Sequence, residues 1–227
     1  MPESKEITMD VKDFFPIWNQ LTEAQQTRIS SAAVHGLAPK GSIIHNGSRN
    51  CTGLLLVEQG YLRAKILSEE GREITIYRLS ERDICLFSAS CMMHSIQFEV
   101  TVEAETDSSL WIIPADVYQE VMRESACLAN FTNEIMATRF SDVMGLIEQI
   151  LWKSMDKRLA GFLMEESAVE NSTALKITHE EIANHLGTAR EVVTRMLRYF
   201  QSEGMVRLSR GTVEITNLNR LASLQAS

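Results

Sequence analysis

One short segment of the sequence gathers side chains that can read DNA. Its members are Arg190, Glu191, Thr194, Arg195 and Arg198. Their spacing places them on one face of a helix. A guanidinium pairs with O6 and N7 of guanine, a carboxylate accepts from N4 of cytosine, and a threonine hydroxyl contacts a base or a phosphate. The segment therefore predicts a helix that reads bases through its first four members and holds phosphate through Arg198, unless it is an ordinary helical hairpin with a solvated charged face.

The residues around this face predict two short helices that meet at a tight turn. Thr178 and Glu181 form the capping-box pattern that starts a helix, and Gly187 supplies the left-handed residue that ends it. The apolar faces comprise Ile182, Ala183 and Leu186 in the first helix and Val193, Met196, Leu197 and Phe200 in the second. Because Ala183 is small, the second helix can cross closely. These features predict a helix-turn-helix over residues 177–201.

A β-hairpin follows the expected reading helix. Gly204 ends that helix, and two short strands, 205–208 and 212–215, flank a turn at 209–211. A hairpin in this place predicts a wing beside the helix-turn-helix. Arg210 at its tip is either a phosphate contact or a solvated turn residue.

The charge of the chain is unevenly distributed. The 227 residues carry a formal charge of −8 at pH 7, with a pI near 5.2. Residues 1–155 hold 13 basic and 21 acidic side chains, whereas residues 156–227 hold 9 of each. Whole-chain acidity therefore does not exclude double-stranded DNA as a partner, because the binding face is local.

The sequence predicts a cytoplasmic protein that does not contact a membrane. The first twenty residues are charged and lack the apolar run of a signal peptide, and no stretch of about 18 apolar residues occurs. The four cysteines are Cys51, Cys85, Cys91 and Cys127. Because they are scattered and contain no Cys-x-x-Cys pair, we expect reduced thiols rather than a disulfide framework or a metal site.

From residue 39 onward the sequence changes from helical to β-type. A helical region is expected over 10–35, and another helix opens at Pro114. Between them lie short runs at 42–45, 53–57, 61–67, 73–79, 84–87, 97–102 and 109–113, separated by glycine-containing or charged turns. Short strands at regular spacing predict an antiparallel barrel or sandwich. With the flanking helices, the fold class is α+β.

A long helix is expected from about residue 125 to residue 155. Along it Met136, Phe140, Val143, Ile147 and Ile150 recur at alternating steps of four and three. This spacing forms the a/d seam of a coiled coil. A helix of about 30 residues is about 45 Å long, which is too long for one small barrel to cover. The seam therefore favours a homodimer over packing against the chain's own β-domain.

The order of barrel, dimer helix and winged helix-turn-helix resembles the Crp/Fnr family of bacterial transcription regulators over essentially the whole chain. The similarity is most specific in residues 189–197 and 200–206, and it extends to 39–47 and 54–60 in the expected opening strands. The resemblance implies that residues 1–124 form a β-roll of the jelly-roll type. Such a β-roll is cupin-like and is related to cyclic-nucleotide-binding domains. The resemblance also implies a dimerisation helix at 125–155, a DNA-binding domain at 156–227 and RNA polymerase as a partner.

The resemblance also assigns roles to single residues. Arg190, Glu191 and Arg195 match the base-reading positions of the family, which implies a palindromic operator with TGTGA-like half-sites in which Arg190 selects one guanine. Thr178, His179 and Thr188 match phosphate-contacting positions at helix starts. On the residues alone, a plain surface histidine is an equally good interpretation of His179.

The expected sensory domain departs from the family's nucleotide-binding pattern. Relatives that bind cyclic nucleotides carry a Gly-Glu pair and then an Arg-Ser or Arg-Thr pair, whereas residues 83–100 contain no arginine. The iron–sulfur branch needs cysteines near its N-terminus, and Cys51 is the first one here. We therefore expect neither cyclic AMP nor an iron–sulfur cluster.

The segment in that place is rich in soft ligands. Its candidate effector-binding residues are Cys85, Phe87, Cys91, Met92 and His94. It resembles the Cys-Met-His-Ser stretch of the family's haem-containing carbon monoxide sensor, but two residues rather than one separate Cys91 from His94 here. The chain also begins Met1-Pro2, as that sensor does. Three alternatives stay open: an apolar small-molecule effector, haem, and a thiol-based redox or metal signal.

A second class of function is a cupin-like barrel enzyme or binding module with an incidental winged helix. Such an enzyme needs a His/Glu metal constellation on the barrel strands. The expected strand region offers only His45 and His94, without paired carboxylate spacing. We therefore expect no catalytic residues and no metal ligands.

Overall fold

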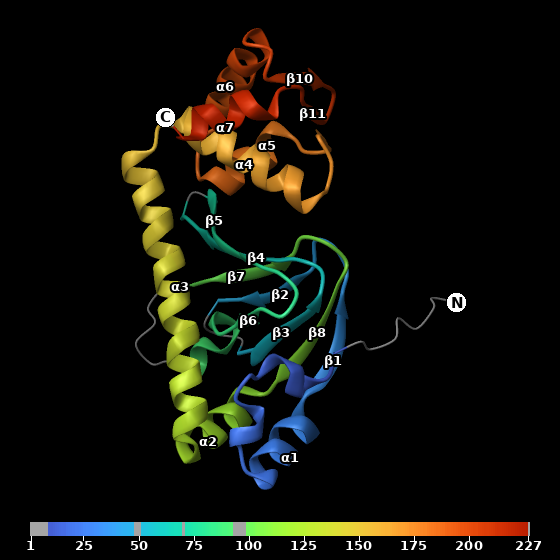
Figure 1. The fold of residues 1–227 in the computed structure, drawn as a ribbon, viewed down its shortest axis with the longest axis vertical. Coiled ribbons are helices and arrows are strands. Elements are labelled where there is room, and N and C mark those ends of the chain that lie inside the picture. Colours follow the sequence, from blue (N-terminus) through green and yellow to red (C-terminus); the bar gives the residue numbers. More distant parts are fainter. Residues whose placement is uncertain (1–8, 48–50, 70, 93–98, 227) are drawn as a thin grey trace, which may run out of the picture. The chain divides into compact units, whose positions relative to one another are not determined.

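The computed structural model describes residues 9–47, 51–69, 71–92 and 99–226 (Figure 1). The chain divides into two compact units. The roll unit comprises residues up to 66 together with 76–143, and the reading unit comprises 67–75 together with 144–227. No helix of the described residues is long and apolar enough to cross a membrane.

The first part of the roll unit is less helical than its apolar spacing predicts. The elements are η1 (Val11–Phe14), η2 (Trp18–Gln20), α1 (Glu23–Ala32) and β1 (Val34–Ala38). Thr22 starts α1 because its hydroxyl accepts from the backbone N–H of Gln25. Phe14 and Phe15 are buried from 3-10 turns rather than from an α-helix. The predicted helix over 10–35 is therefore correct only for α1, and β1 was missed.

Two antiparallel four-stranded sheets form the β-roll within the described residues (Figure 1). Their strands are β2 (Ile43–Asn46), β3 (Leu54–Gln59), β4 (Leu62–Leu67), β5 (Glu73–Leu79), β6 (Ile84–Cys85), β7 (Thr101–Ala104) and β8 (Ser108–Ile113), together with β1. The strand orders are β1-β8-β3-β6 and β2-β7-β4-β5. The predicted α+β fold with an N-terminal antiparallel roll is confirmed. The strand expected at 84–87 is shorter, because Phe87 begins the 3-10 helix η3 (Phe87–Met92).

The core of the roll unit joins the strands to the helices that flank them. Leu54 and Ile113 from the sheet, Tyr118 from α2 (Ala115–Glu124) and Leu128 from α3 (Ala126–Trp152) are all fully buried in one cluster. The turn between β3 and β4 requires Gly60, which has φ +96° and lies so near Ser108 that a Cβ would approach its Oγ to 2.3 Å. Because Tyr118 and Leu128 are buried in the same cluster as the strand residues, α2 anchors α3 against the end of the β-roll.

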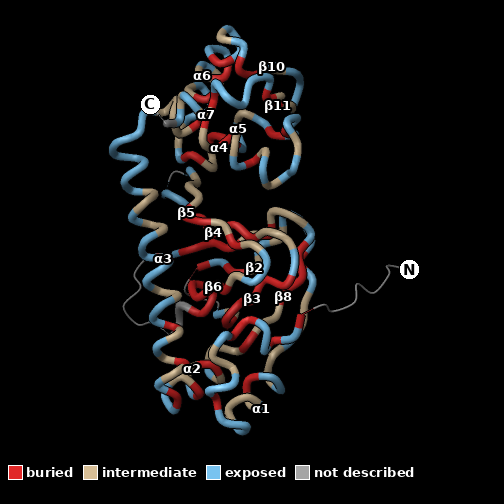
Figure 2. Tube along the Cα trace, viewed as in Figure 1, coloured by how far each residue is buried: buried red, intermediate tan, exposed pale blue. Residues whose placement is uncertain are grey.

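Helix α3 ends earlier than the predicted limit of residue 155. It closes at Trp152, and α4 (Met155–Val169) begins after Ser154. Its first half contributes buried residues, whereas the second half is mainly exposed, as the pale blue turns in Figure 2 show. The long helix is thus confirmed in type.

The reading unit is built on a small three-stranded sheet and a bundle of short helices. After α4 come β9 (Ala174–Leu175), α5 (His179–Leu186), α6 (Arg190–Ser202), β10 (Val206–Ser209), β11 (Thr212–Ile215) and α7 (Leu218–Ala226). The strand order is β10-β11-β9, so the predicted wing hairpin is confirmed. Helix α4 runs to Val169, well into the polar stretch 165–174, and buries Glu166. Strand β9 and helix α7 were not predicted.

The cysteines divide into two kinds. Cys85 and Cys127 are free, as expected. Cys51 is disulfide-bonded, so the prediction that all four thiols are reduced is wrong at this residue.

A hydrogen bond between α2 and α3 provides a test of this packing. The Tyr118 hydroxyl lies 2.8 Å from Thr132 Oγ1, which itself donates to the Leu128 carbonyl at 2.8 Å. Burial raises the pKa of Tyr118 to about 12. Tyr118→Phe removes one buried hydrogen bond while keeping the ring, so we expect the free energy of unfolding to fall by about 1 kcal/mol. Denaturant unfolding measures this change, and an unaltered midpoint would contradict the role of the bond.

Candidate nucleic-acid interface

Local hydrogen bonds define the start of α5 and the turn after it. The Thr178 hydroxyl accepts from the backbone N–H of Glu181 at 3.2 Å, and the Glu181 carboxylate accepts from the N–H of Thr178 at 2.7 Å. Gly187 has φ 63° and ψ 40°, and its N–H donates to the Ala183 carbonyl. The capping box and the left-handed glycine therefore lie where the sequence predicts them.

The two helices of the motif pack through the apolar faces expected from the sequence. Buried side chains comprise Ile182, Ala183 and Leu186 of α5 and Val193, Leu197 and Phe200 of α6, with Met196 partly buried against them. Ala183 has no side chain beyond Cβ, which allows close approach of the helices. This packing holds the opposite face of α6 toward solvent.

The exposed face of α6 carries the predicted base-reading residues. Arg190, Glu191, Arg195 and Arg198 are exposed, and Thr194 is half-buried. The first two of these lie in the first helical turn. In a helix-turn-helix, the N-terminal residues of the second helix contact base edges. The four exposed side chains and the half-buried Thr194 lie together on the solvent side of α6. This is the part of the motif that can contact base edges.

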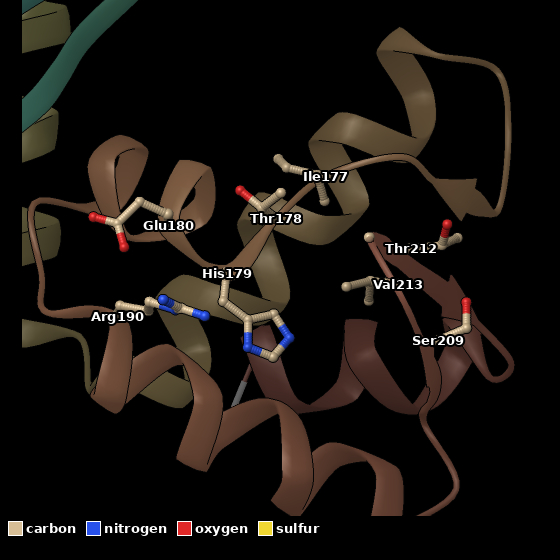
Figure 3. A pocket seen from close by; sticks show the side chains of 9 residues that line it. Ile177, Thr178, His179, Glu180, Arg190, Ser209, Thr212 and Val213 are labelled. Atoms are coloured by element: carbon tan, nitrogen blue, oxygen red, sulfur yellow. The ribbon is translucent and has the colours of Figure 1, made fainter.

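A cleft of about 430 Å³ lies between the starts of α5 and α6 and the wing. Figure 3 shows Arg190 and His179 near each other in this cleft, with Ser209 and Thr212 from the wing on the other side. Thr178 also contributes to the lining. Free N–H groups and the helix dipole favour an anion at the start of a helix. The cleft thus combines the guanidinium of Arg190 with the hydroxyls of Thr178, Ser209 and Thr212. The Glu180 carboxylate also lines it, and the donors suit a phosphate backbone.

His179 and Thr194 form a contact that the sequence did not reveal. Nδ1 of His179 lies 2.9 Å from the Thr194 hydroxyl, so a side chain predicted to hold phosphate is bonded to one predicted to read bases. Burial, together with the charges of Arg190 and Arg198, lowers the pKa of His179. His179 is therefore neutral at pH 7 and joins α5 to the reading face.

The wing and the turn place the remaining predicted phosphate contacts. Arg210 is exposed beside Gly211 at the tip of the β10–β11 hairpin. Arg207, by contrast, pairs across the strands with Glu214 at 2.9 Å. Thr188 lies half-buried in the turn, and its N–H donates to the Ala183 carbonyl at 3.0 Å. Arg210 is the predicted phosphate contact of the wing, whereas Thr188 lies at the start of α6.

Arg158 of α4 supports the turn and was not predicted. Its Nη2 donates to the Leu186 carbonyl at 2.5 Å, at the last residue of α5. Burial lowers the pKa of this guanidinium. The carbonyls at the end of a helix need partners, and Arg158 supplies one just before the Gly187 turn. No local pattern signals this role, because the partner is 28 residues away.

The candidate effector residues lie only partly within the described structure. Cys85 is buried, its Sγ lies 3.9 Å from the Tyr77 hydroxyl, and burial raises the pKa of its thiol. The ring of Phe87 packs against Tyr77 with centroids 5.7 Å apart. The backbone of Cys91 and Met92 belongs to η3, but their side chains and His94 lie outside the described residues. Cys85 and Phe87 are therefore brought together around Tyr77.

The histidines of the roll do not assemble a metal centre in the part of the chain that the structure describes. His45 contacts the Thr52 hydroxyl at 3.2 Å, and His35, which lies on β1, contacts Glu58 at 2.7 Å. His35 is a strand residue, although the apolar spacing predicts a helix up to residue 35.

Comparisons with known proteins identify both units. A Crp-like helix-turn-helix domain model matches residues 157–224, and a cyclic nucleotide-binding domain model matches residues 37–125. A crystal structure of a Crp/Fnr-family transcriptional regulator from Eubacterium rectale is 62% identical, has a TM-score of 0.93, and is matched over 95% of this chain and 100% of that chain. This chain belongs to the Crp/Fnr family of transcriptional regulators.

More distant Crp/Fnr relatives agree with this assignment. The transcriptional regulator SdrP of Thermus thermophilus is 25% identical over 177 residues, which span 75% of this chain and 83% of SdrP. The cyclic AMP receptor protein of the same organism is 24% identical over 200 residues, which span 88% of this chain and 92% of that protein. The chain is a DNA-binding transcription regulator and not a cupin-like enzyme, so the main prediction from residues 177–201 is confirmed.

The position of His179 in this Crp/Fnr regulator predicts a pH-dependent affinity for DNA. A phosphate near His179 would offset the charges of Arg190 and Arg198 and raise the lowered pKa again, so binding would take up a proton. We expect DNA affinity to rise roughly two- to fivefold between pH 7.5 and pH 6, and His179→Gln to reduce this slope. Fluorescence anisotropy at constant ionic strength measures both proteins.

Stability of the free protein should respond to pH with the opposite sign. A lowered pKa means that the unfolded chain binds the proton more readily. The stability that neutral His179 contributes is therefore present above the unfolded pKa of about 6.5 and is lost as the pH falls through the folded pKa.

Identical pH slopes of DNA affinity for the wild type and His179→Gln would contradict a phosphate contact.

Proposed function

We propose that this Crp/Fnr regulator binds a palindromic operator as a homodimer, with half-sites that resemble TGTGA. The observation that carries the proposal is the exposed arrangement of Arg190, Glu191 and Arg195 on the first two turns of α6. Arg190 selects a guanine through O6 and N7, and Glu191 accepts from a cytosine N4. Thr194, oriented by His179, contributes a hydroxyl to the same surface.

Phosphate contacts surround this reading surface in the proposal. Thr178 and His179 lie at the start of α5, Thr188 lies before α6, and Arg198 and Arg210 extend the cationic surface along α6 and to the wing. These contacts fix the register of the protein on the duplex without reading its sequence. The cleft beside His179 and Arg190 supports one phosphate position.

The apolar seam of α3 supports the homodimer. Phe140, Ile147 and Ile150 are 67%, 41% and 42% exposed in the single chain, although their side chains are large and apolar. Val143 is half-buried on the same seam, and Met136 packs partly against the roll core. Exposed Met144 and Leu151, which the sequence analysis did not include, widen the apolar face. Apolar surface of this extent is stabilised by burial against a second α3.

The proposed regulatory input enters through the roll. We place the effector at the segment that begins with Cys85 and Phe87 and continues through Cys91, Met92 and His94. Cys85 and Phe87 contact Tyr77 on β5. An effector there shifts the populations of two dimer arrangements, and thereby the spacing of the two reading helices. RNA polymerase is the proposed partner of the DNA-bound dimer.

Substitution of Arg190 tests the proposed operator. Arg190→Gln removes the bidentate donor to guanine, and each such pair is worth about 1–3 kcal/mol of discrimination. We expect the variant to bind a TGTGA palindrome about 10- to 100-fold more weakly and to lose the preference for G·C at one position of each half-site. Selection from a random DNA library followed by anisotropy measures both effects.

A charge-matched control is available on the roll unit. Arg123 is exposed in the last turn of α2, so Arg123→Gln removes the same charge away from the reading face and should retain wild-type affinity. If sites selected by the wild type show no G·C preference at the Arg190 position, the proposed operator is wrong.

The dimer is tested by placing a charge in the seam. Phe140→Asp introduces a carboxylate that would be buried between two copies of α3, so we expect dissociation into monomers and at least about 30-fold weaker binding to the palindrome. Ser141→Asp adds the same charge one residue away, at an exposed position outside the seam, and should remain dimeric. Sedimentation velocity measures both; a dimeric Phe140→Asp protein would place the interface elsewhere.

A further inference from the structure

Arg139 is a buried cation on the helix that carries the seam. It is only 9% exposed. Its Nη2 donates to Asp83 Oδ1 at 3.0 Å, and its Nη1 donates to Asp142 Oδ2 at 2.9 Å. One carboxylate belongs to the roll and the other to α3 itself. The guanidinium therefore connects two elements that are 56 residues apart in the chain.

Asp83 is fixed tightly in the roll. Its second carboxylate oxygen, Oδ2, accepts from the backbone N–H of Ser80 at 2.8 Å and from the Ser80 hydroxyl at 3.0 Å. Its own carbonyl accepts from the N–H of Val57 at 2.9 Å. The adjacent Arg82 has φ 72°, which marks a tight turn between β5 and β6. Any movement of this turn is therefore transmitted to the oxygen that holds Arg139.

Tyr77 brings the start of the effector segment to the same guanidinium. The Arg139 Cζ lies over the Tyr77 ring, 4.8 Å from its centroid. The same ring packs on Phe87, and its hydroxyl faces the Cys85 thiol. Cys85 lies two residues after Asp83, at the end of β6. The ion pair thus joins Arg139 to Asp83, at the start of the segment 83–87. The cation–π contact joins it, through Tyr77, to Cys85 and Phe87 at the end of the same segment.

The position of Arg139 on α3 relates these contacts to the dimer. In the heptad of Phe140 and Val143 at a and d, Arg139 occupies g and Asp142 occupies c. A g residue flanks the seam, so a shift of Arg139 rotates or translates the seam residues next to it. Asp142 makes an i, i+3 pair with Arg139, so its hydrogen bond stays within α3.

We propose that the Asp83–Arg139 ion pair, supported by the Tyr77 ring, is the coupling element through which the β5–β6 turn sets the position of α3. This inference rests on the proposed function, because it assigns the regulation of the effector segment to one contact. Arg139 is a positioning residue in this scheme: it touches neither DNA nor an effector. The role is testable because Arg139 pairs with two carboxylates of equal charge. Asp83 lies on the roll, whereas Asp142 lies on α3 itself.

The test compares Asp83→Asn with Asp142→Asn in the full-length protein. The Asp83→Asn side chain retains an oxygen for the Ser80 contacts but turns an amide NH2 toward the guanidinium, so it breaks the connection between elements. The Asp142→Asn change removes only the contact within α3. DNA affinity, sedimentation and thermal midpoint are measured for each protein on an operator selected by the wild type.

The inference predicts that DNA affinity changes at least about fivefold, in either direction, for Asp83→Asn and less than about twofold for Asp142→Asn, while both variants remain dimeric. Hydrogen exchange along α3 should increase only in Asp83→Asn. Equal affinities of the Asp83 and Asp142 variants would overturn the coupling role, as would a fall in thermal midpoint for Asp83→Asn without a change in DNA affinity. If the wild type selects no operator, the proposed function itself fails.

Discussion

Helix α3 must satisfy two buried polar side chains on the β-roll while it keeps an apolar seam exposed. Thr132 and Arg139 are one heptad apart and point the same way from the helix. A buried hydroxyl or guanidinium costs several kcal/mol without partners, so Tyr118 beside the first and Asp83 beside the second fix the rotation of α3. Because side chains follow each other at a constant angle on a helix, this rotation also fixes where Phe140 points.

The reading unit depends on a different kind of constraint, which is local in sequence. Thr178 and Glu181 satisfy each other's backbone donors, and Gly187 takes the left-handed conformation that closes the turn. These interactions span at most a few residues, and they orient α6 before any DNA is bound. Arg158 then attaches the end of α5 to α4. The side chains proposed to read bases are therefore positioned by backbone geometry rather than by contacts among themselves.

This difference explains what the sequence could predict. The cap, the turn glycine and the apolar faces of α5 and α6 are short-range patterns, and each was found at the expected residue. Features that depend on distant partners were missed. Arg139 lies beside the seam as one more charged residue of a helix, and only the folded roll brings Asp83 and Tyr77 to it. The contact of His179 with Thr194 likewise joins two helices. Residue types and spacing predict which side chains face outward on α6, but they do not predict which residues of other elements bond to them.

The uneven distribution of charge along the chain makes the placement of the α6 side chains important for DNA affinity. The residues up to 155 are strongly acidic and the rest are neutral overall, so the chain gains little from long-range attraction to DNA. Screening at physiological salt limits the repulsion from the acidic part to about 8 Å. In the proposed complex the charged side chains next to the duplex are those of the exposed face of α6, Arg190, Glu191, Arg195 and Arg198. In the proposed dimer, affinity therefore comes from short contacts that must be correctly placed in both copies, and small shifts of α3 would change it.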